Sequence, residues 1–294
     1  MTESLSIDEW QERSVCWGGR PVNAGSMSKL RLVLDTATQV FRAEKVHESC
    51  GDIWPVFANA EAEALERLEN IDGVPKLIAR VFNRRARIAM IVMECCVGQK
   101  LSELAAGPLE CGRVTNIIEQ LLVILDGAHR EGVVHRDLNN TNIILGENDE
   151  LSLVDFGVAK VDGMPYPKSD HFFGTANTSA PEVWIKNGKV DNRSDLYAAG
   201  ILCYELLAGR EANKIAEPAE DGMAYTECDM LAIQNRVHES RRFFHFNECP
   251  VAIEDVPKPI MDFVFWLIKK NPDDRPESAA VALAELRKIM ARSV

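Results

Sequence analysis

The sequence predicts an α+β fold in two lobes: a small lobe with an antiparallel β-sheet and one main helix, and a larger, mainly helical lobe. β-Prone runs with a period of two dominate from about residue 22 to 93, whereas apolar residues at helical spacing prevail from about residue 114. The stretch Glu94–Gly98 fits neither period and is typical of a connector. We therefore expect a tail over 1–15, a small lobe with its hinge over 16–96 and a large lobe over 97–294.

The composition is that of an ordinary globular protein, with 294 residues, 46% hydrophobic and 27% charged. A formal net charge of -12 argues against a general nucleic-acid surface, because binding to phosphate backbones needs clustered Lys and Arg. The sequence shows neither a long apolar run nor a secretory signal, so we expect a cytoplasmic protein that does not bind membranes. The eight cysteines lack C-x-x-C spacing, which favours reduced thiols over a zinc or redox site.

In the small lobe, a strand and the helix after it carry charged residues that face each other. The period of two puts Phe41, Ala43 and Lys45 on one face of the strand, and Glu61 falls on the apolar stripe of the helix. A buried carboxylate is costly unless it is paired, so we expect an ion pair between Lys45 and Glu61. By itself, Lys45 would more often be a solvated strand lysine.

Other elements follow from pattern and length. We expect five strands and one helix in the small lobe, and in the large lobe a fully buried helix near residues 196–209 because its apolar residues lie on every side. The remaining expected elements are a hairpin from Val22, a helix over 56–68, strands over 77–82 and 88–93, a short helix over 101–104, a helix over 114–129, short strands over 142–145 and 151–155, and helices over 259–270 and 278–290.

The most informative stretch is His135-Arg136-Asp137-Leu138-Asn139-Asn140-Thr141-Asn142, followed by Asp155-Phe156-Gly157. Asp137 is a candidate base five residues before the carboxamide of Asn142, and the two short strands would bring Asn142 and Asp155 to adjacent strand ends. Such a group of side chains suits metal and phosphate together, which makes phosphoryl transfer our hypothesis. The alternative is that Asp137 and Asp155 are loop carboxylates that cap nearby amides.

With these residues in line, the chain from about Val22 to its end resembles the eukaryotic-type protein kinase catalytic domain. Independent pieces occur in the family's order. They are Ala43-x-Lys45, Glu61, Met93-Glu94, the H-R-D-L-x-x-x-N stretch from His135 to Asn142, Asp155-Phe156-Gly157, Gly174-Thr175, Ala180-Pro181-Glu182, Asp195 with Gly200, and Arg275.

The resemblance implies transfer of the ATP γ-phosphoryl group to Ser or Thr hydroxyls of proteins, with possible autophosphorylation. Asp137 would orient or accept the hydroxyl proton, and Asn142 and Asp155 would hold Mg²⁺, with Mn²⁺ as a substitute. Lys45, held by Glu61, would grip the phosphates. The residues implied around the nucleotide are Asn23, Gly25, Ser28, Ala43, Met93, Glu94 and Cys96.

The resemblance also implies an activation segment from Asp155 to Glu182, with Arg136 in a basic pocket that would receive a phosphate. We favour Ser169 as the modified hydroxyl, because Thr175 matches a position inside the catalytic cleft. Glu182 and Arg275 would form a buried ion pair. Asp195 is either a helix N-terminal acid or a hydrogen-bond acceptor for the catalytic-loop backbone, and its sequence position fits both.

Two positions depart from the family pattern. The glycine-rich loop keeps only its middle glycine, Gly25, between Asn23 and Ser28, and Asn139 stands where a lysine is usual. A pseudokinase that binds nucleotide as a scaffold is therefore one alternative, and a small-molecule phosphotransferase of the aminoglycoside type is another. The sequence leaves the oligomeric state and the protein substrate open.

Overall fold

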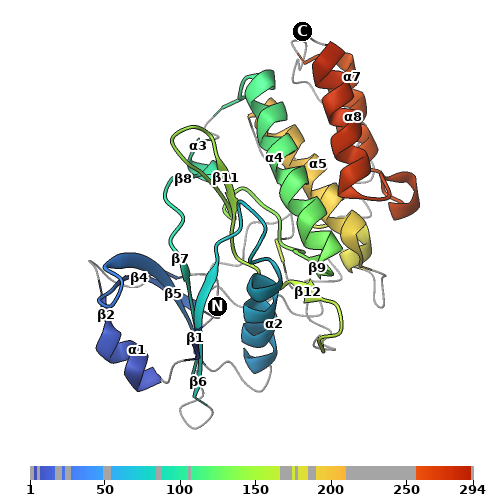
Figure 1. Ribbon diagram of the computed structural model, residues 1–294. Helices are drawn as coiled ribbons and strands as arrows, with labels where there is room; N and C mark the ends of the chain where they lie inside the picture. The colour runs from blue at the N-terminus through green and yellow to red at the C-terminus, as the bar shows by residue number, and fades with distance from the viewer. Residues whose placement is uncertain are drawn as a thin grey trace, which may run out of the picture.

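The structure, a computed structural model, has the two expected lobes, a β-sheet lobe and a helical lobe joined by one connector (Figure 1). It describes residues 3–4, 7–16, 22–23, 28–48, 54–83, 88–104, 107–165, 174–175, 178–184, 190–209 and 256–292. The two-lobed α+β prediction is confirmed, with an antiparallel sheet in the first lobe apart from one parallel pair.

The small lobe is a sheet of seven strands within the described residues, two more than we expected. They are β1 (Glu3–Ser4), β2 (Ser14–Cys16), β3 (Val22–Asn23), β4 (Ser28–Asp35), β5 (Val40–Glu48), β6 (Leu77–Asn83) and β7 (Ile88–Glu94). Their order is β1-β6-β7-β5-β4-β2, with β3 paired to β4. Strand β5 therefore lies in the middle, hydrogen-bonded along its length to β4 and β7.

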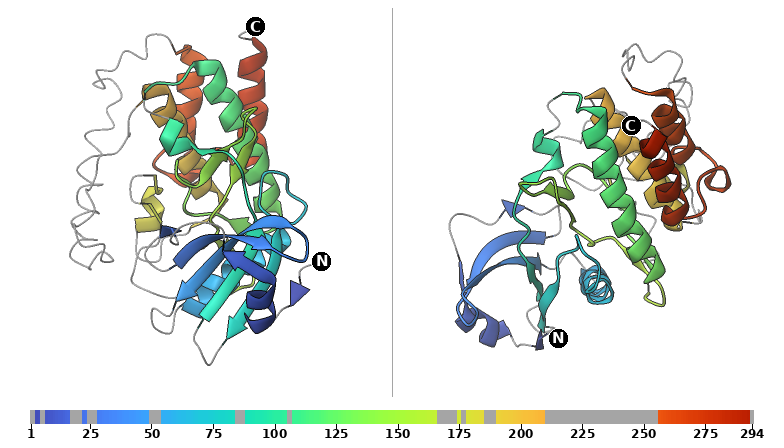
Figure 2. Two further views of the ribbon diagram at one scale, coloured as in Figure 1. Left: turned by 90° about the vertical axis from the view of Figure 1, so that its left-hand side faces the viewer. Right: turned by 45° about the horizontal axis from the view of Figure 1, so that its top comes forward.

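Helices cover both faces of this sheet, as the views in Figures 1 and 2 agree. Helix α2 (Trp54–Arg67) lies on the face toward the large lobe, and α1 (Ile7–Arg13) lies on the opposite face. Because side chains alternate along a strand, Glu44 and Val46 of β5 face α1, whereas Lys45 and His47 face α2. This alternation separates the catalytic face of β5 from its outer face.

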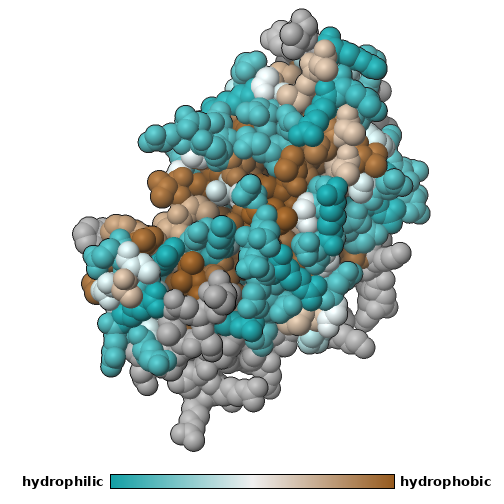
Figure 3. Space-filling view, in the orientation of Figure 1, coloured by the Kyte–Doolittle hydropathy of each residue, from teal (hydrophilic) through white to brown (hydrophobic). Residues whose placement is uncertain are grey.

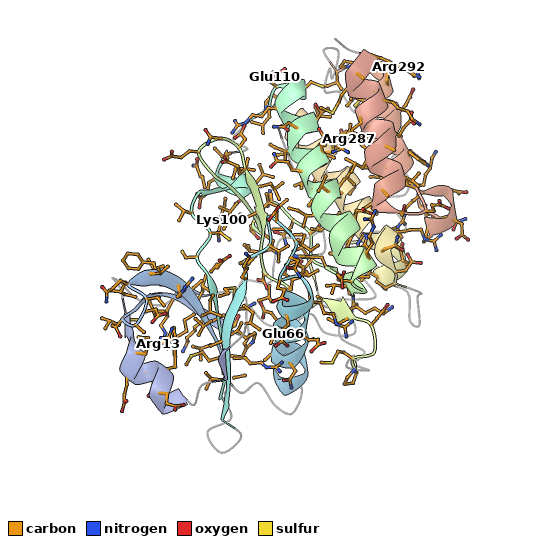
Figure 4. All side chains as sticks on the ribbon, in the orientation of Figure 1. Arg13, Glu66, Lys100, Glu110, Arg287 and Arg292 are labelled. Atoms are coloured by element: carbon orange, nitrogen blue, oxygen red, sulfur yellow. The ribbon has the colours of Figure 1, made fainter. Side chains whose placement is uncertain are left out.

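We expected residues 1–15 to form a tail, whereas the described residues of this segment, 3–4 and 7–15, pack with the sheet lobe. Strand β1 pairs with β6, β2 pairs with β4, and Trp10 of α1 is fully buried in a separate cluster with Val33, Val46, Val81 and other apolar residues of the sheet. At the end of α1, Arg13 (labelled in Figure 4) forms two hydrogen bonds with Asp35, at 2.6 and 2.8 Å. Elements this short carry no readable periodicity, whereas their tertiary contacts are extensive.

The described helices of the large lobe are α3 (Leu101–Leu104), α4 (Cys111–Arg130), α5 (Asn192–Ala208), α7 (Lys258–Leu267) and α8 (Ala279–Arg292), with 3₁₀ turns at Pro181–Trp184 and Pro272–Asp274. Among these helices, α5 and α8 pack against α4, and α7 packs against α5 and α8 (Figure 1). Residues 194–208 of α5 are buried throughout, as its apolar pattern predicts. Arg287 of α8 (labelled in Figure 4) donates to Glu119 of α4 at 2.6 Å. No helix among those described is both long and apolar enough to span a bilayer.

The connector is residues 95–98, between β7 and β8 (Gln99–Lys100). Strand β8 pairs with β10 (Ile143–Leu145), and β10 pairs with β11 (Leu151–Leu153). Gly98 has φ of 156°, and a Cβ there would lie 2.2 Å from the Leu145 carbonyl oxygen, so the connector can run this close to β10 only with glycine. A two-stranded pair of β9 (Val133–Val134) and β12 (Lys160–Val161) brackets the site described next.

Candidate active site

Asp137 lies at the centre of the site, in the loop between β9 and β10, and four donors reach its carboxylate. Its Oδ1 accepts from the Thr175 backbone N–H at 2.7 Å, from the Thr175 hydroxyl at 2.8 Å and from Asn139 Nδ2 at 3.3 Å. Its Oδ2 accepts from Asn142 Nδ2 at 3.0 Å. The carboxylate is therefore held in place, with fewer donors on Oδ2 than on Oδ1.

Asn139 orders this loop as well as contacting Asp137. Its Nδ2 donates to the Thr175 hydroxyl at 2.9 Å, and its Oδ1 accepts from the Thr141 backbone N–H at 2.8 Å. The second contact is a side-chain-to-backbone turn, which asparagine forms readily and lysine cannot form. The residue that stands where the family has lysine thus has a structural reason to be asparagine.

Lys45 joins the two lobes through two carboxylates. Its Nζ lies 2.7 Å from Glu61 Oε1 on α2 and 2.8 Å from Asp155 Oδ1, which follows β11 in the large lobe. The expected pair of Lys45 with Glu61 is present, and both side chains are buried. The ammonium group is thus held where the lobes meet, beside the carboxylate of Asp155.

Two non-glycine residues of the site have left-handed backbone conformations, Arg136 with φ of 69° and Asp155 with φ of 67°. Each such conformation costs about 1–3 kcal/mol and persists only where surrounding contacts impose it. Asp195, in the first turn of α5, supplies those contacts for the loop: its carboxylate accepts from the backbone N–H groups of His135 and Arg136, both at 2.9 Å. Asp195 therefore has both of the roles considered for it. It is an acid in the first turn of α5, and it accepts hydrogen bonds from the loop backbone.

His135 is packed rather than presented to the cleft. It is fully buried, its Nδ1 accepts from the Asp137 backbone N–H at 3.2 Å, and its ring meets Phe156 edge-on at 4.7 Å between centroids. Its Nε2 lies 3.2 Å from the Val154 carbonyl oxygen. His135 thereby connects the loop of Asp137 to the segment that carries Asp155.

The environments of Asp137 and Asp155 push their pKa values in opposite directions. Burial raises the pKa of Asp137, and the hydrogen bonds from Thr175 offset this only in part. Burial acts the same way on Asp155, but the Lys45 ammonium outweighs it, so the pKa of Asp155 lies below its ordinary value. Carboxylates with separated pKa values are typical of sites in which one group handles a proton and the other remains ionised.

The oxygens of Asn142 and Asp155 fit a magnesium ion. The Asn142 backbone carbonyl accepts from Val154 N at 2.9 Å, which brings the two residues to the same end of the β10–β11 hairpin. Asn142 Nδ2 donates to Asp137, whereas Asn142 Oδ1 has, within the described residues, one long contact, at 3.5 Å from the Thr141 hydroxyl. The Asp155 side chain is 38% exposed, and amide and carboxylate oxygens are ligands that Mg²⁺ accepts.

Comparison with known proteins agrees with this geometry. The family model of the protein kinase domain matches residues 20–286. This chain belongs to the protein kinase domain family. It is 32% identical over 241 residues to serine/threonine-protein kinase pkn3 of Myxococcus xanthus, 33% identical over 216 residues to Pkn1 of the same organism, and 29% identical over 234 residues to PknL of Mycobacterium tuberculosis.

These matches cover 78%, 69% and 78% of this chain, but 41%, 29% and 53% of the respective relatives. The chain thus spans about half, or less, of the length of these relatives. All three relatives carry the name serine/threonine-protein kinase.

In this kinase domain, apolar residues gather between the two lobes on the face that Figure 3 shows. Ala43 pairs with Met93 across β5 and β7, and the connector begins one residue later, after Glu94. Within the described residues the Cys96 backbone N–H has no hydrogen-bond partner, which suits a group that would read an adenine edge. The Glu94 backbone N–H, by contrast, donates to the Lys76 carbonyl oxygen at 3.0 Å.

Only part of the expected glycine-rich loop lies within the described residues. Asn23 pairs with Lys29 and so begins the β3–β4 hairpin, and Ser28 is a buried residue that pairs with His47. Gly25 lies outside the described residues. Ser169, the hydroxyl that we favoured as a phosphorylation site, also lies outside them.

The pair of Glu182 and Arg275 lies at the end of the stretch that the resemblance implies is an activation segment. The two side chains share hydrogen bonds of 2.8 Å at both Arg275 terminal nitrogens, and Glu182 also accepts from the Ser194 hydroxyl at 2.7 Å. The guanidinium carbon of Arg275 lies 4.8 Å from the centre of the Tyr197 ring. Both charged residues are buried, so this tie is shielded from solvent.

Three residues that contact the side chains of the candidate site were not predicted from the sequence. Thr141 binds Asn139, His129 of α4 lies 2.9 Å from the Asp195 carboxylate, and His47 lies 3.2 Å from Glu61. A signal existed for His47, because the strand period that places Lys45 also places His47 on the same face. No comparable signal existed for His129, since its partner lies 66 residues away along the chain.

Proposed function

We propose that this chain is an ATP-dependent protein kinase that phosphorylates serine and threonine hydroxyls of proteins. The observation that carries the proposal is Asp137: a carboxylate held by Asn142 and Thr175, with a raised pKa, beside the Lys45–Glu61–Asp155 group. The names of the related kinases support the choice of serine and threonine.

Each residue of the site would have a separate role in phosphoryl transfer. Asp137 Oδ2, which takes a single donor, would orient the substrate hydroxyl and receive its proton. Lys45 would turn part of its ammonium toward the phosphates while Glu61 keeps it in place. Magnesium, held by Asn142 and Asp155, would neutralise charge on the transferred phosphoryl group. The Thr175 hydroxyl would keep Asp137 Oδ1 occupied, so that Oδ2 remains the reactive oxygen.

The two alternatives predict different behaviour. A scaffolding pseudokinase would bind nucleotide through Lys45 and transfer nothing, whereas an aminoglycoside-type enzyme would phosphorylate a small molecule. The buried tie between Glu182 and Arg275 supports the protein kinase, since it anchors a segment suited to docking a polypeptide. Protein substrates in the cytoplasm, and autophosphorylation that includes Ser169, are part of the proposal.

The test measures phosphate transfer from ATP to the protein itself and to generic proteins, with phosphorylated residues located by mass spectrometry. Asp137→Asn and Asp155→Ala should each lower transfer by about 10²-fold or more, because general-base catalysis alone contributes about 10²–10⁴-fold. Asp72→Asn is the matched control, since Asp72 is exposed. Transfer confined to small molecules, or thermal stabilisation by nucleotide without any transfer, would refute the proposal in favour of one alternative.

A further inference from the structure

Glu61 has two carboxylate oxygens with different surroundings. Oε1 accepts from Lys45 at 2.7 Å, whereas Oε2 lies 3.2 Å from Nε2 of His47. Both Oε2 and Nε2 are buried, and within the described residues neither has an aligned hydrogen-bond partner. A small rotation of the imidazole ring would convert this contact into a hydrogen bond, and each atom would then satisfy the other.

The position of His47 is rigid. It lies two residues after Lys45 on the central strand β5, paired with Ser28 of β4 on one side and Ala89 of β7 on the other, and its side chain is 7% exposed. Helix α2 covers this face of the strand and supplies Glu61, which is 1% exposed. A donor fixed on the sheet is thus aimed at a carboxylate on the helix.

Glu61 needs a second donor because Lys45 is shared. The single ammonium group of Lys45 bonds both Glu61 and Asp155, and a nucleotide phosphate would make a third claim on it. Burial opposes ionisation of Glu61, yet the charge of Lys45 and the imidazole of His47, 3.2 Å away, bring the pKa of Glu61 below its ordinary value. The groups that influence Glu61 electrostatically are Lys45 and His47 on β5 and Asp155 after β11, so His47 is the side chain beside Lys45 that can donate to it.

We propose that His47 is a positioning residue: its Nε2–H donates to Glu61 Oε2 and keeps that carboxylate, and with it α2, aligned on Lys45 when Lys45 engages a nucleotide. The inference rests on the proposed role of Lys45 as phosphate anchor. If the 3.2 Å contact between His47 and Glu61 holds the carboxylate in place, its loss weakens nucleotide binding, whereas the loss of mere packing by a buried ring would not.

The test compares three substitutions of His47 by titration with ATP and Mg²⁺, read as binding affinity, and by the KM for ATP against kcat. His47→Gln places an amide N–H near the position of Nε2, whereas His47→Asn is polar but too short, and His47→Leu is apolar. A hydrogen bond to a charged group contributes enough for a loss of about tenfold or more. We expect about tenfold weaker binding and higher KM for the Leu and Asn variants, with Gln within about threefold of wild type.

A double-mutant cycle with Glu61→Gln separates positioning from packing. If His47 acts through the Glu61 carboxylate, His47→Leu should weaken binding in the wild-type background and add little in the Glu61→Gln background. Equal losses in both backgrounds, or equal losses for Gln and Asn at position 47, would overturn the proposal. Should the Leu variant fail to fold, the Gln and Asn pair still decides the question.

The outcome also distinguishes failure of this inference from failure of the proposed function. Wild type that binds no nucleotide would refute both, because Lys45 would then have no phosphate to hold. Wild type that binds and transfers phosphate, with all three His47 variants unchanged, would refute only the role of His47. Thermal unfolding of each variant, measured alongside, identifies any loss that reflects global destabilisation.

Discussion

At the scale of single residues, Asn139 is the position where this kinase domain departs most clearly from its family and where the structure explains the departure. Both polar atoms of the Asn139 amide form hydrogen bonds: Nδ2 donates to the Thr175 hydroxyl, and Oδ1 accepts from the Thr141 backbone N–H. A lysine would restore a positive charge near the transferred phosphoryl group but would lose the turn at Thr141. The local architecture therefore favours an amide over a cation.

Asn139→Asp is expected to lower transfer by up to about tenfold, more than Asn139→Ala does, because a partly protonated base loses part of its contribution to catalysis. Aspartate keeps the acceptor for Thr141 but replaces Nδ2, which lies 3.3 Å from Asp137 Oδ1, with a second carboxylate oxygen. Two carboxylates this close cannot both ionise easily, so the pKa of Asp137 would rise further and the base would be partly protonated. Steady-state transfer to a generic protein at neutral pH measures the effect; an alanine variant as slow as the aspartate variant would show that charge is not the cause.

At the scale of elements, α1 shows how a short segment can complete a lobe. Trp10 fills the outer cluster of the sheet, and its Nε1–H donates to Glu44 Oε2 at 2.7 Å. Glu44 also forms an ion pair with Arg31 of β4. The outer face of the sheet thus has its own small core, apart from the larger core that contains α2 and α4.

Trp10→Ala is expected to destabilise the protein by about 3–5 kcal/mol, the usual cost of removing a buried large aromatic side chain. It would also leave the buried Glu44 carboxylate without its indole donor. Thermal or denaturant unfolding measures the loss, and Trp10→Phe, which keeps most of the ring volume, should lose clearly less. Because Trp10 lies on the face of β5 opposite Lys45, kcat at a temperature where the variant is folded should change little; a large fall in kcat there would contradict this separation.

The helices and strands differ in how far the sequence alone predicts them. The long helices α4 and α5 carry enough residues for their burial to be read from periodicity, and the strand period was enough to predict the pair of Lys45 with Glu61. Helix α1 has seven residues, and the partner of Trp10 lies 34 residues away along the chain. Motifs and long periodic segments encode their own structure locally, whereas Trp10 and His129 acquire their partners only through tertiary packing.

At the scale of the whole molecule, the lobes share one core and one ion-pair group. Leu65 of α2 and Leu68, which follows the end of this helix, belong to the same apolar cluster as Ile117 and Leu121 of α4, so burial is continuous from one lobe to the other. The pair of Lys45 with Asp155 adds a charged link across the same boundary. Protonation of Asp155 would therefore weaken a contact between lobes as well as a contact within the site.

Stability should consequently fall in acid. The folded pKa values of Glu61, Asp155 and Asp195 lie below their ordinary values of 4.5, 3.8 and 3.8. Their contribution is complete above those ordinary values and is lost as the pH falls toward the lower folded values. Asp137, whose pKa is raised, acts in the opposite sense and offsets part of the loss.

We expect the unfolding midpoint of wild type to decline between about pH 5 and pH 3, and that of Asp155→Asn to decline less steeply, because the asparagine does not titrate. Thermal unfolding at a series of pH values, at constant ionic strength, measures both curves. Asp72→Asn again serves as the control, since an exposed carboxylate should leave the slope unchanged. Parallel curves for wild type and Asp155→Asn would show that the link between the lobes contributes nothing to acid sensitivity.

The strand order of the small lobe has one more consequence. Strands β1 and β2, both from the first 16 residues, lie at the two margins of the sheet, whereas the family match begins only at residue 20. A chain shortened to that match would leave the backbone N–H and C=O groups of β6 and of residues 33–35 open to pairing, beside an uncovered face with Val46 and Val81. Open sheet edges next to exposed apolar surface are sites of strand-to-strand aggregation. We therefore expect a chain that starts at residue 20 to self-associate more readily than one that keeps the first 16 residues.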